Sequence, residues 1–101
     1  MAVDRVQKFI VENTARFELV GGDVRLNGSK FGYQKKNKFL ILPNVFHDFV
    51  CAGTNPETVA DALERAGFLE TSGPNRKKKQ ERIDGQLAYF YSVPDSILKA
   101  E

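Results

Sequence analysis

Residues 55–67 constrain the fold more strongly than any other part of the chain. The Asn55 side chain can cap the first turn of a helix, and Pro56 is pre-organised for the first helical position. Apolar residues then recur at helical spacing, at Val59, Ala60, Leu63 and Ala66. Gly67 is typical of the residue that follows a helix C-terminus. The pattern predicts an amphipathic helix over 56–66, whose apolar face must pack against other elements.

Strands and a second helix are predicted around this segment. The sequences FGYQ and KFLIL indicate two short strands joined by a tight basic turn, KKN. Pro43 then suits the first turn of a helix that would end before Gly53. After the 56–66 helix, a polar loop leads to two segments separated by Asp84-Gly85, which is a strong hairpin signal.

The order of these elements indicates a fold class. Two helices joined by a tight Gly-containing turn form a helix-turn-helix, and a hairpin directly after it makes a winged helix. A further helix is predicted over 4–15, from Asp4 and the apolar stripe Val6, Phe9 and Ile10. We therefore expect one α+β domain over 1–101, a winged helix-turn-helix with a small antiparallel sheet. Its predicted parts are an N-terminal helix (4–15), a winged-helix core (31–93) and a C-terminal tail (94–101). The expected core comprises Phe9, Ile10, Phe39, Ile41, Val45, Phe46, Phe49, Val59, Leu63 and Phe68.

The composition narrows the class of protein. The chain has 101 residues, of which 42% are hydrophobic, enough for one modest core and too many for a disordered chain. A single cysteine excludes an internal disulfide and a cysteine-rich zinc module. No apolar run is long enough to span a bilayer, and the N-terminus has no apolar stretch of signal-peptide length. We expect a cytoplasmic binding module without a membrane partner.

Charge is distributed unevenly along the chain. The formal net charge is only +2, yet Arg25 to Lys38 contains five basic residues and no acid. Arg76 to Arg82 contains five more, with Glu81 as the only acid. Neither the turn 35–38 nor the segment 76–82 has an apolar residue that would give it a packing role, so their cations are expected to be free to contact phosphates. The predicted nucleic-acid contacts are Arg76, Lys77, Lys78, Lys79 and Arg82, seconded by Lys35, Lys36 and Lys38.

Contacts of this kind predict salt-dependent affinity with little sequence specificity. The strand type stays open between single-stranded and duplex DNA, and between DNA and RNA. Four aromatic residues are candidates for stacking on unpaired bases, although most are expected in the core or on a sheet face. They are Phe31, Tyr33, Tyr89 and Tyr91.

The predicted 56–66 helix is not expected to recognise base sequence. In a helix-turn-helix protein the second helix enters the major groove. Here that helix carries Glu57, Asp61 and Glu64, whose charges would be repelled by phosphates. An exposed, solvated face is the expectation for this carboxylate row. The alternative function is a protein-interaction module that docks a partner through this acidic helix, with the lysines serving solubility.

No catalytic, metal or cofactor site is predicted. His47 and Cys51 lie four residues apart, but a structural zinc site needs four ligands and the chain has no other His or Cys. Cys51 is expected to pack as a small hydrophobic residue and His47 to lie at the surface. The glycines do not have the spacing of a phosphate-binding loop, so the chain by itself is not expected to hydrolyse a nucleotide.

A longer pattern resembles a known family. Residues 32–53 read GYQKKNKFLILPNVFHDFVCAG, and Pro56 is followed by Val59, Ala60 and Leu63, then by Ala66-Gly67-Phe68. Arg82, Ile83 and Gly85, followed by the aromatic-rich stretch 87–93, continue the pattern. Residues 31–93 thereby resemble the C-terminal winged-helix-like domain of replicative helicases of plasmids, phages and chromosomal cassettes. A weaker similarity is to the C-terminal domain of conjugative relaxase-helicases. The resemblance implies a DNA-binding accessory domain and the helicase ATPase core as a possible partner.

Overall fold

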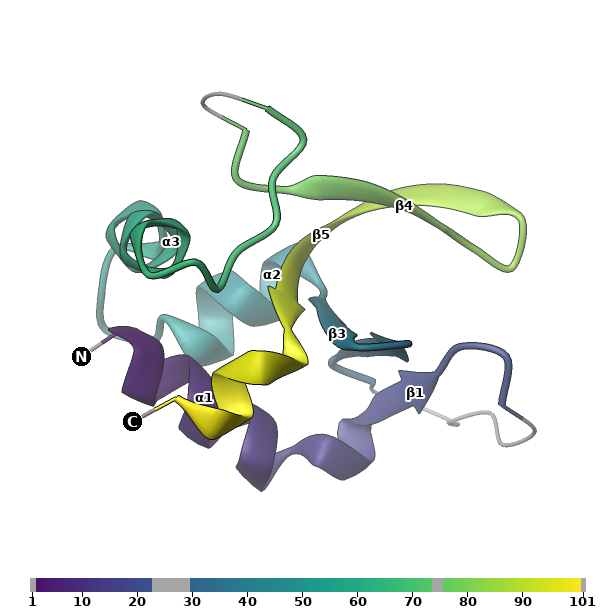
Figure 1. The fold of residues 1–101 in the computed structure, drawn as a ribbon, viewed down its shortest axis with the longest axis horizontal. Helices are drawn as coiled ribbons and strands as arrows, with labels where there is room; N and C mark the ends of the chain where they lie inside the picture. The colour runs from purple at the N-terminus through teal and green to yellow at the C-terminus, as the bar shows by residue number, and fades with distance from the viewer. Residues whose placement is uncertain (1, 23–29, 74–75, 101) are drawn as a thin grey trace.

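The computed structural model describes residues 2–22, 30–73 and 76–100, and its framework is a five-stranded sheet (Figure 1). The strands are β1 (Phe17–Leu19), β2 (Gly32–Lys35), β3 (Lys38–Ile41), β4 (Lys79–Ile83) and β5 (Gln86–Pro94). They are arranged in the order β1-β2-β3-β5-β4. The β2–β3 and β4–β5 hairpins are confirmed, and the fold is mixed α+β as predicted.

One strand pair departs from the antiparallel sheet that was expected. β1 lies parallel to β2, with Phe17 opposite Gly32, whereas the other pairs are antiparallel. Phe17 is buried beside Phe39, with ring centroids 5.4 Å apart, so burial of this side chain draws β1 to the outer edge of β2. On the other side of β2, Gly32 permits the close approach of β3, because a Cβ there would lie 1.9 Å from the Leu40 carbonyl oxygen.

The predicted helices are present with adjusted ends. They are α1 (Ala2–Glu12), α2 (Pro43–Val45), continued by the π-helical segment η2 (Phe46–Val50), and α3 (Pro56–Arg65). The described residues also contain two 3₁₀ turns, η1 (Thr14–Arg16) and η3 (Asp95–Lys99). Asn55 caps α3 as predicted, since its Oδ1 accepts a hydrogen bond of 2.8 Å from the Glu57 amide. Gly67 follows α3 with a φ of 83°, the left-handed conformation expected after a helix C-terminus.

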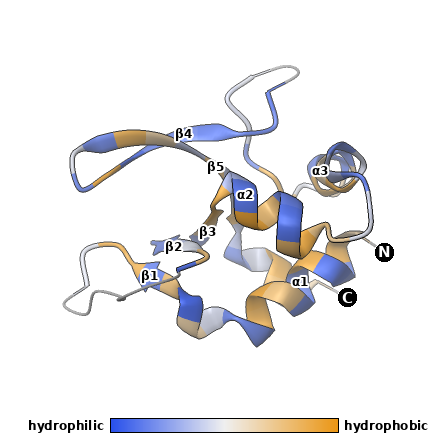
Figure 2. Cartoon of the chain, turned by 180° about the vertical axis from the view of Figure 1, so that it is seen from behind, coloured by the Kyte–Doolittle hydropathy of each residue, from blue (hydrophilic) through white to orange (hydrophobic). Residues whose placement is uncertain are grey.

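The main core lies between the helices and one face of the sheet. Alternate residues of β3 and β5 (Phe39, Ile41, Tyr91 and Val93) face the helices and are buried there. Figure 2 shows hydrophobic and hydrophilic residues alternating around the helices that cover this face. Seven of the ten predicted core residues are buried: Ile10, Phe39, Ile41, Val45, Phe46, Val59 and Leu63. Phe9 and Phe68 are only partly buried.

Phe49 is the one predicted core residue that is wrong. It is 55% exposed, because the chain widens into a π-turn in which the Cys51 amide donates to the Phe46 carbonyl oxygen. The wider turn directs Phe46 and Val50 inward and leaves Phe49 at the rim. An ordinary helical spacing would have placed Phe49 on the same face as Phe46.

A second, smaller cluster forms on the opposite face of the sheet. Leu40, Ile83 and Phe90 are buried together there, with Tyr33 and Val20 packed against them. The β4–β5 hairpin therefore does not project freely, because its inner face packs against β3. Within the described residues, no helix combines the length and apolar character needed to cross a membrane.

Candidate nucleic-acid interface

The β4–β5 hairpin carries Lys79 and Arg82 on β4 and extends away from the helices (Figure 1). Asp84 and Gly85 both have positive φ angles, 53° and 82°, which is the conformation that a two-residue hairpin turn requires. Side chains alternate between the two faces of the hairpin. One face carries Lys79 and Glu81, and the other carries Gln80 and Arg82, paired across the strands with Tyr89 and Leu87 respectively.

The two basic stretches of the sequence meet at the base of this hairpin. Lys38 and Lys79 both reach the same oxygen of Glu70, at 3.3 and 3.5 Å. Glu81 lies between the stretches, with Oε2 at 2.6 Å from the ammonium nitrogen of Lys38 and Oε1 at 3.0 Å from that of Lys35. Three lysines and two glutamates thus form one charge cluster.

Hydrogen bonds and neighbouring charges move the pKa values of this cluster further from neutral pH. Burial tends to raise the pKa of Glu81, but hydrogen bonds from Lys38 and Lys35 outweigh it and hold the pKa below its usual value. The pKa of Glu70 is likewise lowered, because a hydrogen bond from Ser92 and the charge of Lys38 outweigh the effect of burial. Burial tends to lower the pKa of Lys38, but its hydrogen bond to Glu81 and the charge of Glu70 outweigh this effect and raise the pKa above its usual value. All three groups are therefore charged near neutral pH.

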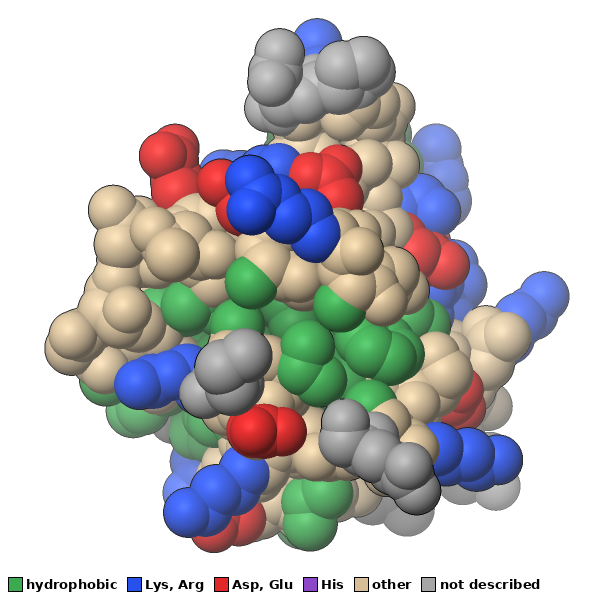
Figure 3. All heavy atoms as spheres, turned by 60° about the vertical axis from the view of Figure 1, so that its left-hand side comes forward, with side chains coloured by type: hydrophobic (Ala, Val, Ile, Leu, Met, Phe, Trp, Pro, Cys, Tyr) green, Lys and Arg blue, Asp and Glu red, His purple; other side chains and the backbone are tan. Residues whose placement is uncertain are grey.

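Lys77 contacts the acidic face of α3. Its ammonium nitrogen lies 2.7 Å from Asp61 Oδ1 and also pairs with Glu64. These hydrogen bonds raise the pKa of Lys77 and lower that of Asp61. Two of the three acids of α3 therefore anchor the basic loop. Figure 3 shows positive and negative side chains gathered side by side below the loop on the face that carries α3.

The expectation that all the predicted cations are free is therefore corrected for half of them. Lys35, Lys38, Lys77 and Lys79 have carboxylate partners, because the fold brings acids from α3, β4 and the segment before the loop to them. Arg76, Lys36 and Lys78 are exposed and have no ion pair within the described part of the chain. Arg82 is exposed and donates a 3.2 Å hydrogen bond to the Gly85 carbonyl oxygen. Arg25 lies outside the described residues.

One of the four candidate stacking residues lines a basic hollow. Arg76, Lys77 and Lys78 line a hollow of about 320 Å³ together with Tyr89, which is 51% exposed. Tyr91 is instead buried, with its ring stacked 3.9 Å from that of Phe46. The remaining two candidates, Phe31 and Tyr33, are half-buried, and each is packed against a core cluster. The structure thus distinguishes Tyr89 from the other three candidates.

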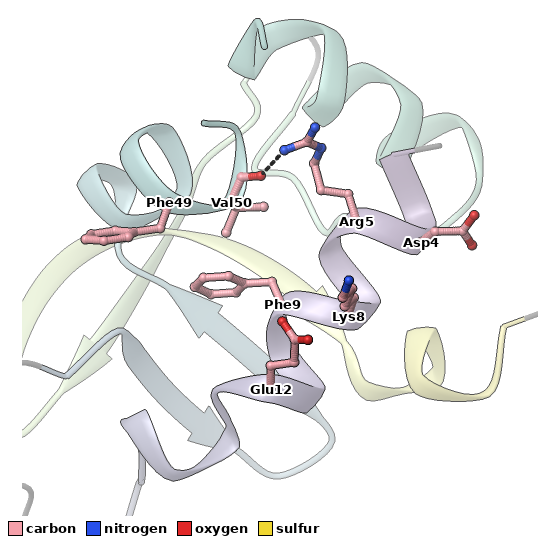
Figure 4. Close-up of a pocket in the computed structure, with 7 residues that line it drawn as sticks. All are labelled: Asp4, Arg5, Lys8, Phe9, Glu12, Phe49 and Val50. Carbon is pink, nitrogen blue, oxygen red and sulfur yellow. Dashed lines mark hydrogen bonds between the residues drawn. The ribbon is translucent and has the colours of Figure 1, made fainter. Parts of the chain in front are cut away.

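A different hollow, of about 480 Å³, lies between α1 and η2 (Figure 4). Phe9 and Phe49 form its apolar wall, and Arg5 donates a 3.0 Å hydrogen bond to the Val50 carbonyl oxygen. Its charged lining is balanced, since Arg5 and Lys8 are accompanied by Asp4 and Glu12. Among its described residues, the hollow beside Tyr89 is lined by three cations and no acid, so it is the better match for an anion.

His47 and Cys51 occupy the positions expected of them. Cys51 is buried, and desolvation raises the pKa of its thiol to about 11, so it is not an activated nucleophile. His47 is exposed, and its Nε2 lies 3.0 Å from the Tyr91 hydroxyl. No group of three potential metal ligands occurs among the described side chains.

Sequence reasoning missed the acids that organise this interface. Glu70 and Glu81 were not recognised as partners of the lysines. The alternation of β4 carried a usable signal for Glu81, because Glu81 lies two residues before Ile83 and so faces the same way. Glu70 had no comparable signal, since its contacts depend on how the chain returns from α3.

The chain matches no protein-family model, and its sequence is not significantly similar to that of any curated protein.

Proposed function

We propose that this domain binds nucleic acid through the base of the β4–β5 hairpin, mainly by contacts to backbone phosphates. The observation that carries the proposal is the convergence of two basic stretches, distant in sequence, around Glu70 and Glu81. Among the described residues, the eight predicted cations have four carboxylate partners, Asp61, Glu64, Glu70 and Glu81, which leaves an excess of four positive charges. Lys and Arg concentrated in this way raise affinity for a polyanion.

The order of elements supports a winged-helix version of this function. The α2–η2 segment, a short turn, α3 and the β4–β5 hairpin follow one another as the helix-turn-helix and wing of such a domain would. In this reading the wing and the loop before it make the main contacts. The exposed face of α3, with Glu57, Asp61 and Glu64, makes none. Together with the resemblance of residues 31–93, this favours an accessory domain of a mobile-element DNA helicase.

The alternative, docking of a protein through α3, has less support. Asp61 and Glu64 already bind Lys77 of the same chain, so a partner would have to displace an internal ion pair.

Salt titration of DNA binding tests the proposal. Contact with about four phosphates predicts a slope of log affinity against log salt near −3 to −4, gentler for single strands. The double substitution Arg76→Ala and Lys78→Ala is expected to weaken binding to all sequences alike and to flatten the slope by roughly 1.5–2 units. Fluorescence anisotropy at several salt concentrations measures both effects.

The matched control is Lys8→Ala with Lys99→Ala, which removes two exposed cations from α1 and η3. It lowers the net charge equally and is expected to leave the salt slope nearly unchanged. Absence of binding by the parent protein at low salt would contradict the proposal and favour the interaction-module alternative. An equal effect of the control pair would show that only total charge matters.

A further inference from the structure

We propose that the ligand of this interface is an unpaired nucleic-acid strand, whose bases stack on Tyr89 and pack against Leu87, two residues before it on the same face of β5. This inference rests on the proposed nucleic-acid binding and names the form of nucleic acid that the site takes. It is carried by the exposure and spacing of two apolar side chains within a basic surface.

Tyr89 and Leu87 point from the same face of β5, two residues apart. They are 51% and 55% exposed, although both are large apolar side chains on a hairpin that is otherwise rich in charge. Exposed aromatic residues bordered by cations are typical of surfaces that stack bases while holding the phosphates. Here Tyr89 shares its hollow with Arg76, Lys77 and Lys78, so the stacking surface and the phosphate contacts adjoin.

The residues across the strand pair complete the site. Gln80 lies opposite Tyr89, and Arg82 lies opposite Leu87. An amide has both a donor and acceptors that can bond to the edge of a base, and an arginine has donors for a second phosphate or base edge. One face of the hairpin thus combines two apolar side chains on β5 with an amide and a cation on β4.

The geometry favours an unpaired strand over a duplex. Side chains two residues apart on a strand are separated by about 6.6 Å, whereas successive bases along one strand of a duplex are about 3.4 Å apart. Neighbouring bases can contact both Tyr89 and Leu87 only when they are unstacked from each other. In a duplex the flat faces of the bases are covered by stacking, so that the two apolar side chains would meet only the polar backbone and edges.

The experiment compares three probes by anisotropy with the full chain: a 12-nucleotide oligothymidine, an abasic oligomer with the same number of phosphates, and a 12-base-pair duplex. Oligothymidine is expected to bind more tightly than the other two. Tyr89→Ala is expected to weaken oligothymidine binding by about 5- to 150-fold and to leave binding of the abasic oligomer unchanged. Tyr89→Phe keeps the ring and is expected to keep the affinity. Val11→Ala, which trims an exposed apolar residue of α1, is the control and is expected to have no effect.

The outcomes separate this inference from the function on which it rests. If none of the three probes binds, the proposed nucleic-acid binding itself fails. If the probes bind but Tyr89→Ala changes oligothymidine and abasic binding equally, or changes neither, the site holds phosphates alone and the stacking inference is wrong. Displacement of oligothymidine by a poly-glutamate peptide of equal charge at equal concentration would also overturn it, since the site would then select charge without bases.

Discussion

Glu81 lies on β4, where it is only 9% exposed and is surrounded by three lysines. Each lysine comes from a different point of the sheet: Lys35 from β2, Lys38 from β3 and Lys79 from β4 itself. A buried carboxylate costs free energy unless it is paired, and here the pairing is multiple. Glu81 therefore holds together three strands whose cations would otherwise repel one another.

This residue makes stability depend on acidity. Because the folded-state pKa of Glu81 is lowered, its charge contributes stability above the pKa of the unfolded chain, about 4.3, and that contribution is lost as pH falls through the folded-state value. Glu70 acts in the same direction. We expect the free energy of unfolding, measured by urea titration, to fall between about pH 5 and pH 3.

Glu81→Gln tests whether this residue causes the fall. It is expected to lower stability at pH 7 and to flatten the decline at acidic pH, because the variant has no carboxylate to protonate. Glu57→Gln, which changes an exposed carboxylate of α3, is the control and is expected to keep the parental profile. A parental profile in Glu81→Gln would mean that other carboxylates control acid unfolding.

At the scale of elements, α3 has two separate roles on its two faces. Its apolar face, with Val59, Ala60 and Leu63, is buried in the main core. Its polar face holds Lys77 and thereby the start of the basic loop. The hairpin likewise has a packed face, with Ile83 and Phe90, and an open face with Tyr89. Each element thus connects the core to the interface.

Leu63→Ala tests the packing role of α3. Leu63 is fully buried, so its truncation is expected to cost about 2–5 kcal/mol from lost burial and the cavity left behind. Chemical denaturation monitored by circular dichroism measures the loss. Ala62→Gly on the less buried side of the same helix is a comparison for helix propensity alone and is expected to cost about 1 kcal/mol. An unchanged denaturation midpoint in Leu63→Ala would contradict the packing of α3 described above.

At the scale of the whole molecule, the same acids that position the basic residues also neutralise part of their charge. Asp61 and Glu64 neutralise Lys77, and Glu70 and Glu81 neutralise part of the lysine cluster. Under the proposed function, phosphates that approach the hairpin would compete with these carboxylates for the lysines. Salt weakens the exposed pairs of Lys77 more than the largely buried pair of Lys38 with Glu81, because solvent-exposed charges are screened more effectively.

Removing the charges of α3 is therefore expected to strengthen DNA binding. In the triple variant Glu57→Gln, Asp61→Asn and Glu64→Gln, Lys77 becomes available to phosphates and three repulsive charges are lost. We expect affinity to rise by about 2- to 10-fold at low salt and the salt slope to steepen by roughly one unit. Anisotropy titrations at two salt concentrations measure both. A collapse of affinity in a variant that remains folded would show that these acids make required contacts.

The local elements follow from the sequence, whereas their meeting points do not. Asn55, Pro56 and Gly67 define α3, and Asp84-Gly85 defines the hairpin, because capping bonds and positive φ angles depend on residues that are neighbours in the chain. The parallel pairing of β1 with β2, the outward position of Phe49 and the carboxylate partners of the lysines depend on contacts between residues far apart in sequence. Hydrophobic periodicity indicates which face of a helix or strand is apolar, but it does not indicate which charged residues of other elements will lie next to that element. For this reason the sequence predicted two basic stretches, and the tertiary structure decided that Lys36, Arg76, Lys78 and Arg82 stay exposed without a carboxylate partner among the described residues, with Tyr89 beside Arg76 and Lys78.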